Sequence, residues 1–238
     1  MASVSAEQPV TVPMLTARWL SQSFVHWAYP PEEVEALLPD GLEADLFQGR
    51  AWVGLTPFVM DSLKAFGAVP LPGPRFLETN LRTYVRLPSG RDGLWFLSIE
   101  VGSPLMLAAR VIGAPYHLGD LQAVTEGAVV RYKGLRRGVG PSPSYRLTVR
   151  VGDPVAEATE QDVWLTSRWR SVTRQAGVLW ETPVEHEPWP LARAAVLDLH
   201  ETLTAHAGLT PPAGEPVAHF SRGVGPVRLG VTRPVSPS

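Results

Sequence analysis

The chain has 238 residues, of which 45% are hydrophobic, so it is long enough to bury a sizeable core within one large domain. It contains no cysteine, which excludes disulfides, thiolate metal sites and cysteine nucleophiles. The formal net charge of −2 gives no overall field that would attract nucleic acid or an anionic membrane.

Charged residues make up 18% of the chain, below the roughly one quarter that is usual for soluble proteins. A surface so poor in charge predicts that apolar patches are covered by further copies of the chain, in a homodimer or larger assembly. Met1–Pro13 shows no basic segment followed by an apolar run, and no stretch approaches the ~20 apolar residues of a membrane helix. We therefore expect a cytoplasmic protein with no membrane partner.

Residues 1–13 and 233–238 are polar and rich in proline and serine, and we expect them to be flexible tails around a single domain, residues 14–232. The first half of that domain predicts a short helix opened by Pro31 and stopped at Pro39-Asp40-Gly41. Its predicted strands cover residues 15–29, 42–47, 51–60, 78–87 and 93–101. A loop with three prolines, residues 70–74, precedes the fourth of these strands.

In the second half, Ser103 is the expected cap of a helix that Gly113-Ala114-Pro115 interrupts. Three strands follow over residues 118–151, then a short helix over 159–165, a strand over 178–186, and two closing strands around Phe220 and Leu229. Residues 191–208 fit either a strand followed by a helix or one helix. Strands greatly outnumber helices, which predicts an α+β fold dominated by an antiparallel sheet, curled or closed into a barrel, with a few peripheral helices.

Three segments together resemble the acetoacetate decarboxylase superfamily: residues 31–43, residues 76–80 and residues 107–119. The second half resembles the YqjF-like branch of that superfamily, in segments 164–166, 187–191 and 219–224. The likeness to this branch extends over residues 14–230, and it implies an acetoacetate-decarboxylase-like fold.

The resemblance also implies that the decarboxylase chemistry is missing. In the decarboxylases two lysines end the third segment, and the first forms a Schiff base with the substrate; here these positions hold Tyr116 and His117. Neither side chain forms an iminium with a ketone. The position of the family's active-site arginine is Ala28, whereas its glutamate is retained as Glu78.

No other lysine is placed to replace the missing one. The chain has two, Lys64 and Lys133. The first is expected in a polar turn and the second among arginines, so both are interpreted as solvated side chains.

The resemblance places Glu78, Tyr116 and His117 at one pocket, where a carboxylate, a phenol and an imidazole can transfer protons. Asn80 and Arg82 follow Glu78 at two-residue spacing and so share its sheet face, and Arg82 can hold a ligand carboxylate with two hydrogen bonds. Trp95 is the aromatic side chain expected to line this pocket. The alternative is a buried polar network with a purely structural role.

Other site types have weaker support. The six histidines show no helical ligand spacing, so we predict neither a metal nor another cofactor. Residues 131–150 carry six basic residues and no acid, but they lack the interleaved aromatic residues of a nucleic-acid surface, so no nucleic-acid partner is expected.

The resulting functional hypothesis is a small-molecule cavity that accepts an organic acid or a carbonyl compound. As an enzyme, the protein would catalyse enolisation, hydration or dehydration through Glu78, Tyr116 and His117. Two alternatives remain: a binding protein without catalysis, and a structural or assembly protein whose pocket is filled by Trp and Phe side chains.

Overall fold

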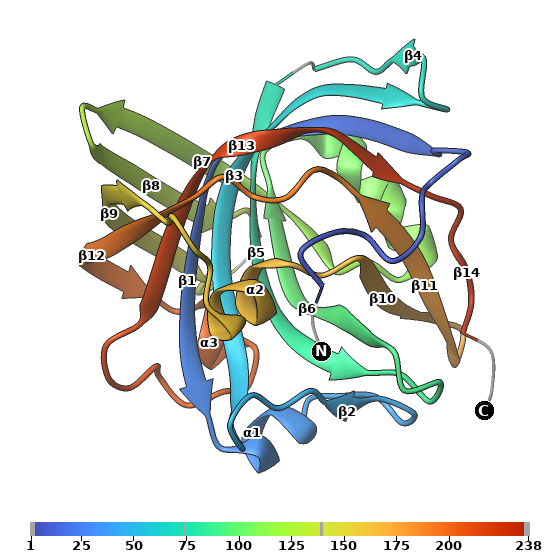
Figure 1. Cartoon of the computed structure of the whole chain (residues 1–238), viewed down its shortest axis with the longest axis horizontal. Coiled ribbons are helices and arrows are strands. Elements are labelled where there is room, and N and C mark those ends of the chain that lie inside the picture. Colours follow the sequence, from blue (N-terminus) through green and yellow to red (C-terminus); the bar gives the residue numbers. More distant parts are fainter. Residues whose placement is uncertain (1–2, 74, 139, 236–238) are drawn as a thin grey trace.

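The computed structural model describes residues 3–73, 75–138 and 140–235, and within them fourteen strands join into one sheet (Figure 1). Most neighbouring strands are antiparallel; the pairings of β6 with β7 and with β10 are parallel. The strands are β1 Leu15–Tyr29, β2 Glu43–Ala44, β3 Ala51–Ala65, β4 Val69–Pro70, β5 Arg75–Arg86, β6 Asp92–Val101, β7 Tyr116–Glu126, β8 Val129–Arg136, β9 Ser144–Pro154, β10 Arg170–Gln175, β11 Val178–Glu185, β12 Leu191–Glu201, β13 Val217–Leu229 and β14 Arg233–Pro234. The predicted α+β fold, mainly antiparallel with a few peripheral helices, is confirmed.

Four short helices accompany the sheet: α1 Pro31–Glu35, the 3₁₀ helix η1 Pro104–Ile112, α2 Glu160–Thr166 and α3 Leu203–His206. Helix α2 begins with a capping box in which the side chains of Thr159 and Asp162 accept hydrogen bonds from each other's backbone amides. Ser103 occupies the N-cap position of η1, as predicted, but its side chain makes no capping hydrogen bond, and the segment after it winds as a 3₁₀ helix.

Several predicted boundaries needed correction. Residues 191–208 form a strand and then a helix, and the two closing strands are one long strand, β13. The strand expected over residues 42–47 shrinks to β2, while β3 runs on to Ala65 and so contains Lys64, which was expected in a turn. Strand β10 was not predicted.

The sheet closes on itself in two ways. Strands β13, β1, β3, β5 and β6 lie side by side in that order. From β6 the pairing continues through β7, β8, β9 and β12 back to β13, which completes a first ring. It also continues through β10 and β11 back to β13, which completes a second ring. In Figure 1 the two rings lie to the left and right of the shared strands.

The shared strands serve both rings, because successive side chains of a strand point to opposite faces. Leu81 of β5 belongs to the hydrophobic core of the first ring, together with Tyr132, Leu147 and Val149, all of which are buried. The neighbouring residues Asn80 and Arg82 point the other way and line a cavity in the second ring. The first ring is therefore packed with side chains, while the second is partly hollow.

The N-terminal segment lies against the second ring. Trp169 Nε1 donates a hydrogen bond to the carbonyl oxygen of Ser3, Glu7 pairs with Arg170, and Val10 is buried. Residues 3–13 thus have defined contacts, and the expectation of a loose tail is corrected for this part. At the other end, β14 pairs with β11, which corrects the tail predicted from residue 233; residues 236–238 lie outside the described part of the chain.

No helix in the described part of the chain combines the length and the apolar character needed to cross a membrane.

Candidate functional site

The second ring contains a cavity of about 580 Å³, within the range of ~300–1,000 Å³ that is typical of small-molecule sites. Its walls come from β1, β3, β5, β6, β10 and β11, with η1 across one end and the segment of Trp189 across another. The cavity reaches the surface near Phe66, whose side chain is 70% exposed. A pocket filled by aromatic side chains, the third hypothesis from the sequence, is therefore not what the structure shows.

Glu78 is the carboxylic acid that lines this cavity, and it is almost fully buried, with 4% exposure. Burial raises the pKa of Glu78 to about 8, although hydrogen bonds from Tyr116 and Asn80 act in the opposite direction. No Arg, Lys or His of the described chain forms an ion pair with it, so no cation offsets the loss of solvation. Glu78 can therefore gain or lose a proton near neutral pH.

Tyr116 is the partner of Glu78. Its hydroxyl donates a hydrogen bond to Glu78 Oε2 at 3.3 Å, and burial together with the nearby Glu78 raises the Tyr116 pKa well above its ordinary value. The turn before it depends on Gly113, which has a φ of +84° and lies so close to β10 that a Cβ would stand 2.2 Å from the Arg174 carbonyl oxygen. This backbone contact fixes the position from which Tyr116 enters the cavity.

His117 does not line the cavity, so its predicted place in the site is wrong. Adjacent residues of a strand point to opposite faces, and because Tyr116 faces the cavity, His117 faces away. It is half-buried close to Glu100 and Arg136, and its pKa is lowered, first by burial and then by the charge of Arg136. The same alternation shows that Trp95 was wrongly expected in the cavity. Leu94 and Phe96 line the cavity, whereas Trp95 packs against the buried cluster that contains Val172.

Asn80 and Arg82 line the cavity beside Glu78, as their spacing predicts. Both are more than nine-tenths buried, and among the described residues the Asn80 Oδ1 and Arg82 Nε atoms have no hydrogen-bond partner. The Arg82 guanidinium lies over the rings of Phe24 and Tyr84 and donates one long hydrogen bond, of 3.4 Å, to the carbonyl oxygen of Leu165.

The two other arginines that line the cavity are neutralised, in contrast to Arg82. Arg168 pairs with Asp45 and Asp92, and Arg170 pairs with Asp92 and Glu7. For Arg82, no carboxylate of the described chain lies at ion-pair distance. The cavity therefore contains one buried cation with no internal counterion.

Much of the wall opposite β5 was not predicted from the sequence. The cavity is also lined by His186, Trp189, Trp19 and Gln22. The imidazole of His186 contacts Trp169 and Trp189 at centroid distances of 4.7 Å, with the ring planes tilted by 47° and 59°. Burial lowers the pKa of His186 to about 4, so this imidazole is neutral at physiological pH. The tryptophan content was the one signal of this aromatic wall, since its members are far apart in the chain.

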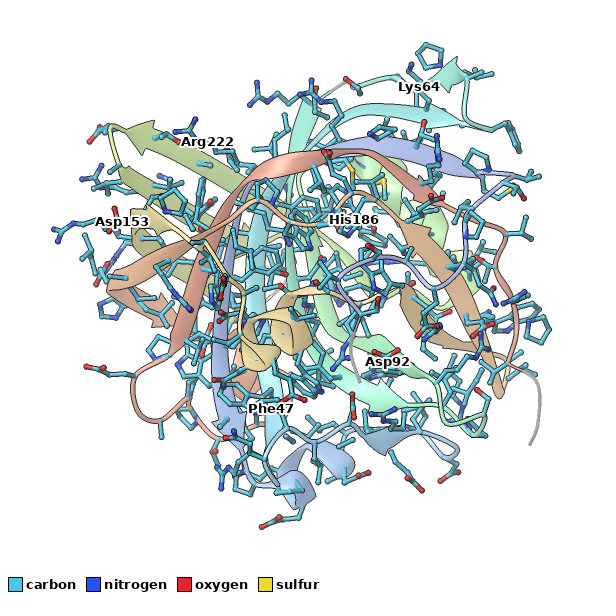
Figure 2. All side chains as sticks on the ribbon, viewed as in Figure 1. Phe47, Lys64, Asp92, Asp153, His186 and Arg222 are labelled. Atoms are coloured by element: carbon cyan, nitrogen blue, oxygen red, sulfur yellow. The ribbon has the colours of Figure 1, made fainter. Side chains whose placement is uncertain are left out.

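Neither lysine reaches the cavity. Lys64 and Lys133 are both exposed, on β3 and β8. Figure 2 shows Lys64 at the edge of the molecule and His186 over its middle. Within the described residues, no three His, Asp or Glu side chains are grouped so that they could hold a metal ion.

Comparison with known families identifies the chain. The DUF2071 family, described as "uncharacterized conserved protein", matches residues 16–225. The chain belongs to this family. It is 31% identical to the "Uncharacterized protein YqjF" of Bacillus subtilis over 208 residues, which cover 86% of each chain. The resemblance to the YqjF-like branch is thus confirmed.

Solved structures relate the fold to acetoacetate decarboxylases. The enduracididine biosynthesis enzyme MppR, in a complex with pyruvate, matches with a TM-score of 0.66 and 18% identity over 97% of this chain and 94% of its own. An acetoacetate decarboxylase-like enzyme from Sphingomonas wittichii matches with a TM-score of 0.62 and 17% identity, over 93% of this chain and 92% of its own. The acetoacetate decarboxylase of Legionella pneumophila matches with a TM-score of 0.61 and 15% identity, over 95% of this chain and 89% of its own. At these identities the likeness establishes the fold.

Proposed function

We propose that this protein binds a small organic acid or carbonyl compound in the cavity and catalyses proton transfer with Glu78 and Tyr116, without a Schiff base. The observation that carries this proposal is a buried carboxyl group, with its pKa raised to about 8, that faces a cavity of about 580 Å³. A general acid or base works best when its pKa is near the working pH. The binding of pyruvate by MppR, a protein of the same fold, is consistent with this ligand class.

The proposed step is an enolisation. Ionised Glu78 removes a proton from the carbon next to a ligand carbonyl, and the electron pair of the broken C–H bond moves into the new C=C bond. Negative charge then develops on the carbonyl oxygen. The Tyr116 hydroxyl turns from Glu78 Oε2, which is protonated in this step, and donates its hydrogen bond to the carbonyl oxygen instead. Tyr116 stays protonated for this task because its pKa is raised well above the ordinary value. If protonated Glu78 returns its proton to a different carbon of the conjugated enolate, the result is isomerisation. If it gives the proton to a hydroxyl on the next carbon, the enolate re-forms the carbonyl, its C=C electron pair forms the new Cα=Cβ bond, the C–O bond breaks and water leaves, and the result is dehydration.

Deuterium exchange tests this proposal directly. In D₂O, proton NMR should show that the protein exchanges the C–H protons next to the carbonyl of at least one compound in a panel of short and long oxo acids. The variant E78Q should slow the exchange about 10²–10⁴-fold, as is usual when a general base is lost. Y116F should slow it less, and the neighbouring H117Q should not change it, because His117 faces away from the cavity.

The outcomes of this experiment separate the hypotheses. Binding of panel members without exchange would contradict catalysis and favour a binding protein without catalysis. Exchange that survives in E78Q would contradict the assigned role of Glu78. If no compound in the panel either bound or exchanged its protons, both the catalytic and the binding hypothesis would be contradicted.

Schiff-base chemistry should be absent. After incubation with acetoacetate and reduction with borohydride, the protein mass should be unchanged, because both lysines are exposed and outside the cavity. An acetoacetate decarboxylase treated in parallel provides the positive control. A stable adduct on Lys64 or Lys133, located by peptide mass spectrometry, would contradict this expectation.

Assembly remains a prediction from the sequence, and two exposed apolar side chains support it. Phe66 and Val111 are 70% and 74% exposed, although both belong to large apolar residue types. We therefore expect a homodimer or larger species in light scattering at concentrations of about tens of micromolar. A monomer under these conditions would contradict the prediction.

A further inference from the structure

The polar groups of the cavity lie far apart along one strand. Glu78 and Arg82 are four residues apart on β5, and at ~3.3 Å per residue their Cα atoms are separated by roughly 13 Å. The Arg82 guanidinium lies between the rings of Phe24 and Tyr84, and among the described residues no ion pair joins it to Glu78. A ligand that reaches from one group to the other therefore has to extend along β5.

The wall between these two groups is apolar. Phe58 is paired with Glu78 across the sheet, Ile99 with Asn80, and Phe96 with Arg82, and all three apolar side chains line the cavity. Asn80 is the polar side chain between the ends, and its amide already bonds Glu78. The cavity thus has a cationic end, an apolar middle and a proton-transfer end.

The cationic end of the cavity, formed by Arg82, suits a ligand group with a single negative charge. The charges of Arg168 and Arg170 are met by Asp45, Asp92 and Glu7, which leaves the guanidinium of Arg82 uncompensated. A guanidinium with free N–H groups matches a carboxylate, to which it can donate two parallel hydrogen bonds. A dianion such as a phosphate ester would need a second free cation, which these ion pairs do not provide.

We propose that the natural ligand is an elongated, amphipathic monocarboxylic acid, with its carboxylate at Arg82, an apolar chain along Phe96, Ile99 and Phe58, and its reacting carbonyl group at Glu78 and Tyr116. With C–C bonds of ~1.5 Å, a gap on the order of 10 Å corresponds to a chain of about eight carbons. This proposal rests on the proposed function and specifies its substrate class: the carbon that loses its proton is remote from the carboxylate.

Binding of saturated fatty acids tests this proposal separately from catalysis, because these acids carry no carbonyl group to enolise. Isothermal titration with a linear series from acetate to dodecanoate should show Kd falling about fourfold for each added methylene, up to about eight carbons, and rising beyond. The R82M variant should weaken octanoate binding at least about tenfold and leave octanol binding unchanged.

Two further variants complete the experiment. R82Q keeps a hydrogen-bonding side chain without charge, and it replaces R82M if that variant does not fold. R222M is the matched control: Arg222 is exposed and lies well away from His186 in Figure 2, so its loss should leave octanoate binding unchanged. Tightest binding of acetate, or octanoate binding unchanged in both Arg82 variants, would overturn the proposal even if deuterium exchange had confirmed the role of Glu78.

Discussion

Replacing Glu78 by glutamine should stabilise the protein at alkaline pH. The pKa of Glu78 is about 8 in the folded protein, against 4.5 for an unperturbed glutamic acid. Between these values the folded state holds a proton that the unfolded state has lost, so the free energy of unfolding of the wild type falls as pH rises from about 4.5 to about 8. At lower pH Glu78 is protonated in both the folded and the unfolded state, and it then causes no loss of stability.

The E78Q variant removes this loss, because glutamine is neutral at every pH and can still accept the hydrogen bond from Tyr116. The shift in the Glu78 pKa between the unfolded and the folded state corresponds to a difference in the free energy of unfolding on the order of 3–5 kcal/mol at alkaline pH. Urea denaturation at about pH 5 and about pH 9 should therefore give nearly equal stabilities at the lower pH, and a clearly more stable variant at the higher one.

Glu100 offers a matched control for this experiment. It is as deeply buried as Glu78, on the neighbouring strand β6, but it receives hydrogen bonds from Arg136 and Ser98. Its replacement by glutamine should lower the stability at about pH 9, since Arg136 would lose its counterion. If E78Q and E100Q changed stability in the same direction at this pH, the raised pKa assigned to Glu78 would be wrong.

The elements could be predicted well from local patterns, because a strand or helix is specified by side chains a few residues apart. The alternation along β5 correctly placed Glu78, Asn80 and Arg82 on one face. Strand β10 was missed because Arg170 and Arg174 at its ends are charged, and the charge of Arg170 becomes acceptable in the interior through Asp92, 78 residues away in the chain. Sequence patterns contain no information about such distant partners.

The errors at the site have the same origin. A resemblance places a segment correctly, but an error of one residue reverses the face on which a side chain lies. This is why Tyr116 was correctly placed while His117 was not, and why Trp95 was chosen although Leu94 and Phe96 on either side of it line the cavity. The wall that contains His186 depends on the closure of the second ring between β11 and β13, which is a long-range pairing.

Replacing two buried arginines, Arg168 and Arg82, by methionine should have opposite effects on the stability of the protein. Arg168 donates hydrogen bonds to Asp92 at 2.5 Å and to Asp45 at 3.0 Å, and its side chain is 1% exposed. The R168M variant would leave these carboxylates inside the protein without this cation. We expect the free energy of unfolding to fall by about 3–5 kcal/mol, as is typical when one member of a buried ion pair is removed.

Arg82 is also buried, but in the part of the chain that the structure describes no carboxylate pairs with it that its replacement would leave behind. Methionine at this position has a similar length, removes a poorly solvated charge, and adds apolar contact with Phe24 and Tyr84. R82M should therefore be as stable as the ligand-free wild type, or more stable, in urea denaturation at neutral pH. A loss comparable to that of R168M would mean that Arg82 supports the fold through its contact with the Leu165 carbonyl oxygen. Tolerance of R82M together with lost octanoate binding would instead mean that the protein maintains an uncompensated charge in its interior for the sake of an anionic ligand.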